Sequence, residues 1–153
     1  MSIFPTKILL ATDGSGEADL AAQTAVDLVG CTNSELHIVT VVPGSPDPAY
    51  GLHETSFRYE TYEEAAEAVR KDAQEVIDEQ VRRVEEAGGN VAGAHLITRE
   101  RKDQAIVRLS EEIGAGLIVM GSRGLGGLRR ALMGSVSDSV VRHAHCPVLI
   151  VRR

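Results

Sequence analysis

Glycines, arginines and serines are concentrated between residues 121 and 139, and these residue types are well suited to binding an anion. The stretch GSRGLGGLRRALMGSVSDS holds five glycines and three arginines, with no acidic residue before Asp138. Glycine lets backbone N–H groups approach a ligand closely, and the exposed N–H groups at the start of a helix attract negative charge. Because the chain as a whole has a formal net charge of −6, this local excess of positive charge indicates a phosphate-binding segment.

The segment matches neither of the two best-known phosphate-binding loops. A Walker A loop needs a lysine after its last glycine, and residues 121–139 contain no lysine. The dinucleotide fingerprint G-x-G-x-x-G, started at Gly124 and Gly126, would need glycine where the chain has Arg129. The spacing is a different one: Gly121, two residues, Gly124, nine residues, Gly134 and Ser135.

Short apolar runs alternate with helical patterns along the chain, and this alternation predicts the elements that position the glycines. The strand-like runs are 7–12, 37–42, about 91–97, 117–120 and 147–151, and the helical patterns are 17–29, 61–87, about 103–113 and about 135–144. This order implies right-handed crossovers and a parallel sheet that is covered on both faces. We therefore expect an α/β fold: an open five-stranded parallel sheet sandwiched by four helices, in strand order 3-2-1-4-5, forming a single domain over 1–153.

Two of the predicted helices carry clear apolar stripes. In the longer helix, Thr61 and Glu64 fit a capping box and Gly88 is placed to end it. The residues expected to face the core are Ala18, Ala21, Ala22, Ala25, Val26 and Val29 in the first helix, and Val69, Ala73, Val76, Ile77, Val84 and Ala87 in the longer one.

The composition is that of a globular protein, with 43% hydrophobic and 25% charged residues. No apolar run approaches the roughly 20 residues that cross a bilayer, so we expect a cytoplasmic protein with no membrane partner. The acidic charge balance argues against a nucleic-acid surface. Cys31 and Cys146 match no metal or redox spacing, and we expect both to be small buried apolar residues.

Histidines offer little support for a metal site. His143 and His145 are two residues apart, so they do not share one face of a helix. A more promising polar residue is Asp13, which directly follows the first strand-like run. Ligands of such sheets bind beyond the carboxyl ends of the strands, so the loop at Asp13 and the glycine-rich segment would form two walls of one cleft. Asp13 could also simply stabilise the turn into the first helix.

The spaced glycines belong to a larger pattern that resembles the universal stress protein family, specifically its ATP-binding branch. The pattern includes ATDGS around Asp13, Val41 near the end of the second run, LIVMG at 117–121 and the terminal CPVLIVRR. It covers almost the whole chain. One departure is Ala11, where many nucleotide-binding relatives carry proline.

The resemblance implies a role for each matching position. The backbone around Val41 would meet the adenine edge, and Asp13 with Thr12 would serve the ribose or a phosphate-bound divalent ion such as Mg²⁺. Gly121 and Gly124 would approach the ribose and first phosphates, and Gly134, Ser135, Val136 and Ser137 would hold the outer phosphates. The predicted nucleotide-binding set is completed by Ala11, Met120 and Arg123. No catalytic residue is assigned.

In function, the resemblance implies a module that binds ATP and signals stress or energy status to partners. Two alternatives remain open at this point: a slow ATPase or ATP-dependent enzyme domain that uses the same cleft, and a binder of cyclic AMP. The terminal strand is expected at the edge of the sheet, where its unpaired backbone groups favour pairing with a second copy. We therefore expect a homodimer through residues 147–152, and a flap over 44–60 that becomes ordered when nucleotide binds.

Overall fold

A five-stranded parallel sheet forms the centre of the computed structural model, which describes residues 2–42, 62–122 and 133–152. The strands are β1 (Lys7–Ala11), β2 (Glu35–Val42), β3 (Val91–Thr98), β4 (Ala115–Gly121) and β5 (Val148–Val151), in the order β3-β2-β1-β4-β5. The helices of the described ranges are α1 (Gly16–Thr32), α3 (Tyr62–Glu86), α4 (Lys102–Ile113) and α5 (Ser135–His143). The predicted fold class and strand order are confirmed.

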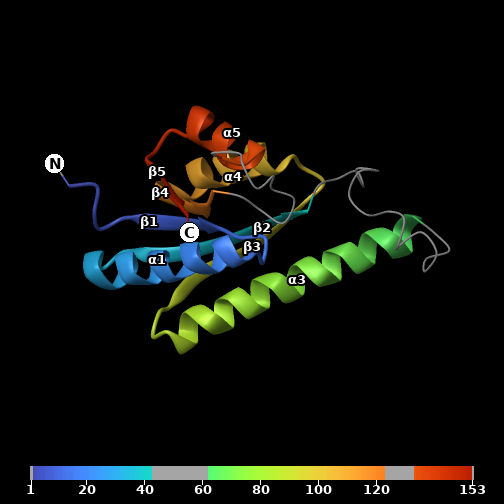
Figure 1. Ribbon diagram of the computed structural model, residues 1–153, viewed down its shortest axis with the longest axis horizontal. Helices are drawn as coiled ribbons and strands as arrows, with labels where there is room; N and C mark the ends of the chain where they lie inside the picture. Colours follow the sequence, from blue (N-terminus) through green and yellow to red (C-terminus); the bar gives the residue numbers. More distant parts are fainter. Residues whose placement is uncertain (1, 43–61, 123–132, 153) are drawn as a thin grey trace.

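Helices cover the sheet on both faces, with α1 and α3 on one side and α4 and α5 on the other (Figure 1). Successive side chains of a strand point to opposite faces. In β1, Ile8 and Leu10 pack in the core beneath α1 and α3, while Leu9 and Ala11 pack in the core beneath α4 and α5. The central strands are therefore apolar on both faces, which explains why their sequences are continuous hydrophobic runs rather than alternating ones.

Helix α3 carries only part of the predicted stripe, in its second half, and Ala87 is an exception there because it lies beyond the helix end and is exposed. Ala73, Ile77 and Val84 are buried, and Gly88 follows the helix end as predicted. The expectation for Val69 is wrong, because its side chain is 47% exposed and residues 63–72 contain no buried side chain. The beginning of α3 extends past the sheet (Figure 1), so this part of the stripe has no strand beneath it. Thr61, the predicted cap, lies outside the described residues.

The two cysteines are less buried than predicted. Cys31 is exposed in the last turns of α1, and Cys146 is only partly buried; both are free thiols. Burial raises the pKa of the Cys146 thiol, which disfavours the reactive thiolate. The predicted flap over 44–60 lies outside the described residues. No helix in the described ranges is both long and apolar enough to cross a membrane.

Candidate functional site

The chain leaves the neighbouring strands β1 and β4 toward opposite faces of the sheet, and this topological switch point defines the candidate site. From β1 the chain continues into α1 on one face, and from β4 it leads to α5 on the other face. Ala11 at the end of β1 is paired with Met120 near the end of β4. Open α/β sheets bind ligands in the crevice beyond such strand ends. We call residues 11–15 the first wall and residues 120–122 with 134–137 the second wall.

The first wall is fastened to the neighbouring strand β2. The Thr12 N–H donates to the Val39 carbonyl oxygen at 3.0 Å. In return, the Thr40 hydroxyl donates to the Thr12 carbonyl oxygen at 3.1 Å. Thr12 is buried, so both of its backbone groups are used to hold the loop in place.

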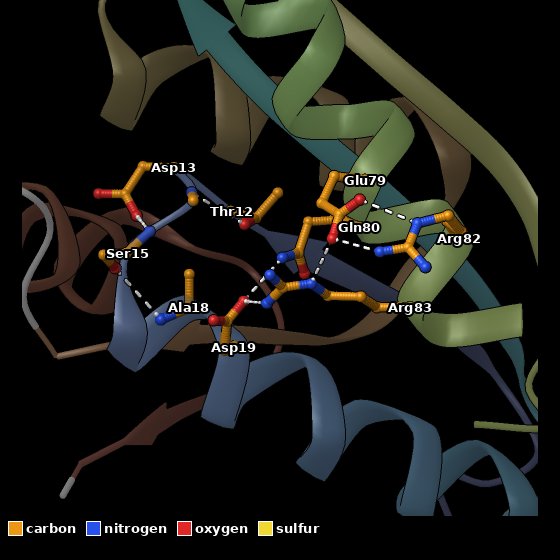
Figure 2. Close-up of polar contacts among 10 residues, drawn as sticks. Thr12, Asp13, Ser15, Ala18, Asp19, Glu79, Gln80, Arg82 and Arg83 are labelled. Carbon is orange, nitrogen blue, oxygen red and sulfur yellow. Dashed lines mark hydrogen bonds and ion pairs between the residues drawn. The ribbon is translucent and has the colours of Figure 1, made fainter. Parts of the chain in front are cut away.

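Asp13 shapes the turn that leads into α1 (Figure 2). Its Oδ1 accepts from the Ser15 N–H at 2.9 Å, and the Thr12 hydroxyl accepts from the Gly14 N–H at 3.3 Å. Gly14 has φ +80°, a conformation that favours glycine. Ser15 is the N-cap of α1, because its hydroxyl accepts from the Ala18 N–H at 3.2 Å. The turn role of Asp13 is confirmed, and a role toward nucleotide stays a prediction.

Behind the first wall, α3 is joined to the first turn of α1 by Asp19 (Figure 2). Asp19 Oδ1 accepts from Gln80 Nε2 at 2.9 Å and from Arg83 Nη1 at 2.7 Å. Hydrogen bonds from Arg82 and Arg83 lower the pKa of Glu79 to about 2, so this carboxylate stays ionised. The sequence prediction missed Gln80, although its place in the apolar stripe of α3 is a signal that a partner must satisfy its buried amide.

Gly121 of the second wall is needed for close packing against α1. A Cβ at residue 121 would lie 3.0 Å from Glu17 Cβ and 3.1 Å from the Glu17 carbonyl carbon. Glycine at this position therefore lets the first turn of α1 approach the end of β4. The predicted contact of Gly121 with the ribose stays a prediction.

Ser122 connects the parts of the second wall, although the sequence prediction did not include it. Its side chain is 1% exposed, and its hydroxyl donates to Glu17 Oε2 at 2.6 Å. Its N–H donates to the Val151 carbonyl oxygen at 2.9 Å, and its own carbonyl oxygen accepts from the Gly134 N–H at 2.6 Å. One residue thus joins α1, β5 and the start of α5.

Helix α5 begins where the glycine spacing predicted, with Gly134 as its N-cap. Glycine has no side chain with which to cap the first N–H groups of the helix, and these groups have no partner within the helix. Ser135 is exposed, whereas Ser137 is buried. The Ser137 hydroxyl lies 2.8 Å from the Ser122 carbonyl oxygen and 3.0 Å from that of Gly134, so its proton is directed into the protein.

The remaining predicted residues fall into two groups. The side chains of Ala11, Val41 and Met120 are buried in the core beneath α4 and α5, so only their backbones are candidates for ligand contact. Arg123 and Gly124 lie outside the described residues. In the described ranges, no group of three or more His, Cys, Asp or Glu side chains is arranged to hold a metal ion.

Comparison with known proteins gives consistent matches across nearly the whole chain. The model of the universal stress protein family matches residues 5–152. A universal stress protein of Methanocaldococcus jannaschii is 33% identical over 150 residues, which cover 96% of this chain and 82% of the relative. The solved structure of a universal stress protein from Lactobacillus plantarum has a TM-score of 0.78 at 24% identity, covering 97% of this chain and 99% of that one.

Two further solved structures contain nucleotides, according to their descriptions. One is a universal stress protein in complex with cAMP, with a TM-score of 0.66 at 23% identity, covering 97% of this chain and 98% of that one. The other is the universal stress protein from Archaeoglobus fulgidus in complex with dAMP, with a TM-score of 0.65 at 23% identity; the match covers 98% of this chain and 99% of that one. At these identities the likeness establishes the fold.

Proposed function

The chain belongs to the universal stress protein family, and from this premise we propose that it is a cytoplasmic module that binds ATP between the two walls and signals stress or energy status. The observation that carries the proposal is the start of α5 at the switch point of the sheet. Its glycine N-cap leaves backbone N–H groups without a side-chain cap, and the positive end of the helix dipole favours phosphate.

The first wall supplies groups of complementary chemistry. The Asp13 carboxylate is only partly buried and lies next to the carboxyl end of β1. In the proposed complex it accepts from ribose hydroxyls or holds a Mg²⁺ ion that bridges the phosphates. The fold neighbours with cAMP and dAMP support an adenine nucleotide as the ligand class.

The test is calorimetric titration of Mg²⁺–ATP into the wild-type protein and Gly134→Val. The backbone at residue 134 has φ −71° and ψ 162°, which valine also adopts, so the variant is expected to fold. The valine side chain beside the start of α5 is expected to block the approach of the phosphates and so abolish ATP binding. Val141→Ala, at an exposed position of α5 outside the second wall, is the control and should bind ATP like the wild type. Unchanged ATP affinity in a folded Gly134→Val protein would remove the proposed site.

Two separate measurements identify the bound nucleotide and test the alternative that the protein is an enzyme. Mass spectrometry of nucleotide released from freshly purified, denatured protein is expected to identify ATP, and cyclic AMP in its place would favour the other ligand. Release of ADP over many turnovers, with and without added metabolites, distinguishes a binding module from an enzyme. We expect slow release that added metabolites do not accelerate.

We further propose a homodimer through residues 147–152. Strand β5 lies at the edge of the sheet, with Leu149 exposed and Ile150 partly buried. Pairing two β5 strands across a two-fold axis would satisfy the free backbone groups of both edges. Ile150→Pro removes a backbone donor and is expected to give monomer or aggregate by light scattering. A wild-type protein that stays monomeric at high concentration would contradict the dimer.

A further inference from the structure

Two histidines approach each other across strands β2 and β3, away from the proposed nucleotide site. His37 Nδ1 lies 3.2 Å from His95 Nε2, and the two ring planes are inclined by only 21°. His37 is the third residue of β2, whereas the candidate nucleotide site lies beyond the carboxyl ends of the strands. The pair belongs to none of the contacts described above, so its chemistry needs a separate explanation.

The approach depends on a glycine in β3. His37 is paired with Gly93, and His95 is paired with Val39, so the two histidines are diagonal neighbours in the sheet. A Cβ at residue 93 would lie 2.6 Å from His37 Nδ1 and 3.0 Å from His95 Nε2. Only a residue without a side chain leaves this space free, so Gly93 lets the His37 ring reach across to His95.

Among the described residues, the outer nitrogen of His37 is buried without a hydrogen-bond partner, and the carboxylate of Glu35 lies near it. His37 Nε2 lies 3.8 Å from Glu35 Oε2, too far for a hydrogen bond. If His37 carries its proton on Nε2, that N–H is directed toward a carboxylate and the Nδ1 lone pair is directed toward His95. Metal-bound histidines commonly donate their second N–H to a carboxylate in this way.

We propose that His37 Nδ1 and His95 Nε2 bind a divalent transition-metal ion, with zinc the best match. At Zn–N distances of about 2.0–2.1 Å, two nitrogens on tetrahedral zinc lie roughly 3.3 Å apart. If the N–metal–N angle were 90°, as in square-planar or octahedral sites, the same bond lengths would place the two nitrogens roughly 2.9 Å apart. The separation of 3.2 Å in the protein is closer to the tetrahedral value.

Binding needs only local adjustment of the pair. Without metal the two nitrogens share a hydrogen bond, so with the His37 proton on Nε2 it is His95 Nε2 that carries the shared proton. To bind the ion, His95 must adopt the tautomer with its proton on Nδ1, and both rings must turn until their lone pairs meet the ion. Glu35, an exposed residue, must also move closer to His37 Nε2. Burial and the neighbouring His37 lower the pKa of His95, which favours the neutral imidazole that ligates metal. Two protein ligands leave two positions for water, and the site therefore exchanges its ion readily.

The experiment is calorimetric titration of Zn²⁺ into reduced, tag-free protein. We expect one zinc ion per chain and a saturable rise in melting temperature. His37→Gln and His95→Gln are each expected to weaken binding at least about tenfold. Gly93→Ala keeps both ligands but pushes the rings apart, so it should also weaken binding. Each variant is first checked for cooperative unfolding.

The matched control removes the other histidines and the exposed cysteine and keeps the pair. The variant that combines His53→Gln, His143→Gln, His145→Gln and Cys31→Ser leaves His37 and His95 as its only histidines, and it should bind zinc as the wild type does. The proposal is overturned if the wild type shows no saturable binding. It is also overturned if binding persists when both His37→Gln and His95→Gln are made, or disappears in the control variant.

Discussion

The two walls of the candidate site are built in opposite ways. In the first wall, side-chain oxygens bind the N–H groups of the same loop: Asp13 accepts from Ser15, and Ser15 caps α1. In the second wall, the helix α5 starts at a glycine that has no side chain with which to cap it. The first wall therefore stabilises its own shape, whereas the start of α5 in the second wall has no side-chain cap, as the proposed phosphate site requires.

The walls also differ in what their glycines do. Gly121 makes room for the backbone of Glu17, so it acts in packing. Gly134 has an ordinary extended backbone and stands at a helix start, so we expect its role to be the absence of a side chain toward the proposed ligand. Two glycines of one sequence motif thus have different physical roles, and substitutions should separate them.

The largest expected effect is on stability, from Gly121→Val. Its Cβ would meet the Glu17 backbone, which cannot move as a flexible side chain does, so we expect a loss of about 3 kcal/mol, at the upper end of typical overpacking costs. Chemical denaturation measures it. Gly30→Ala is the control, because an added Cβ at residue 30 meets no atom within 4 Å. A stable Gly121→Val protein that lost only ATP binding would instead make Gly121 equivalent to Gly134.

The next effect concerns affinity and separates the two roles of Asp13. Asp13→Asn keeps an oxygen that can accept from the Ser15 N–H but removes the charge, so the fold should be unaffected. Binding of Mg²⁺–ATP should weaken by roughly 1–3 kcal/mol, the range for losing a hydrogen bond to a charged group. Calorimetry and thermal unfolding are measured on the same samples. Asp13→Ala should show the same loss of affinity and, in addition, a lower melting temperature.

If Asp13→Asn bound ATP with wild-type affinity while Asp13→Ala melted earlier, Asp13 would act only in the turn. The first wall would then be purely structural, and the contrast between the walls would become sharper than proposed.

Residues that are close in sequence were predictable, and contacts between distant residues were not. The strands and the start of α5 follow from apolar runs and from the position of Gly134, because these signals are local. Ser122 meets Glu17 across 105 positions and Gln80 meets Asp19 across 61, and no local pattern specifies such partners. Val69 was assigned to the core because periodicity shows which residues share a stripe but not where the sheet beneath them ends.

The smallest expected effect tests the hydrogen bond by which α4 holds α5, the helix of the second wall, in place. Asp103 in the first turn of α4 accepts from the Ser139 hydroxyl of α5 at 2.7 Å. Burial alone would raise the pKa of Asp103, but hydrogen bonds from Ser139 and from the Gln104 N–H, together with the charge of Arg101, outweigh burial and lower it. The ionised carboxylate therefore stabilises the fold.

The sign of the pH dependence follows from this lowered pKa. The folded value lies below the unfolded value of about 3.9, so the stabilisation is fully present above that pH and is lost as pH falls through the folded pKa. Asp103→Asn keeps an acceptor for Ser139 but not the charge, and we expect it to cost about 1 kcal/mol at pH 7. The difference between wild type and variant should be constant from pH 7 to about pH 5 and shrink below about pH 4. Urea denaturation at each pH measures it, and a difference that stayed constant down to pH 2 would show that the charge of Asp103 does not help to hold α5.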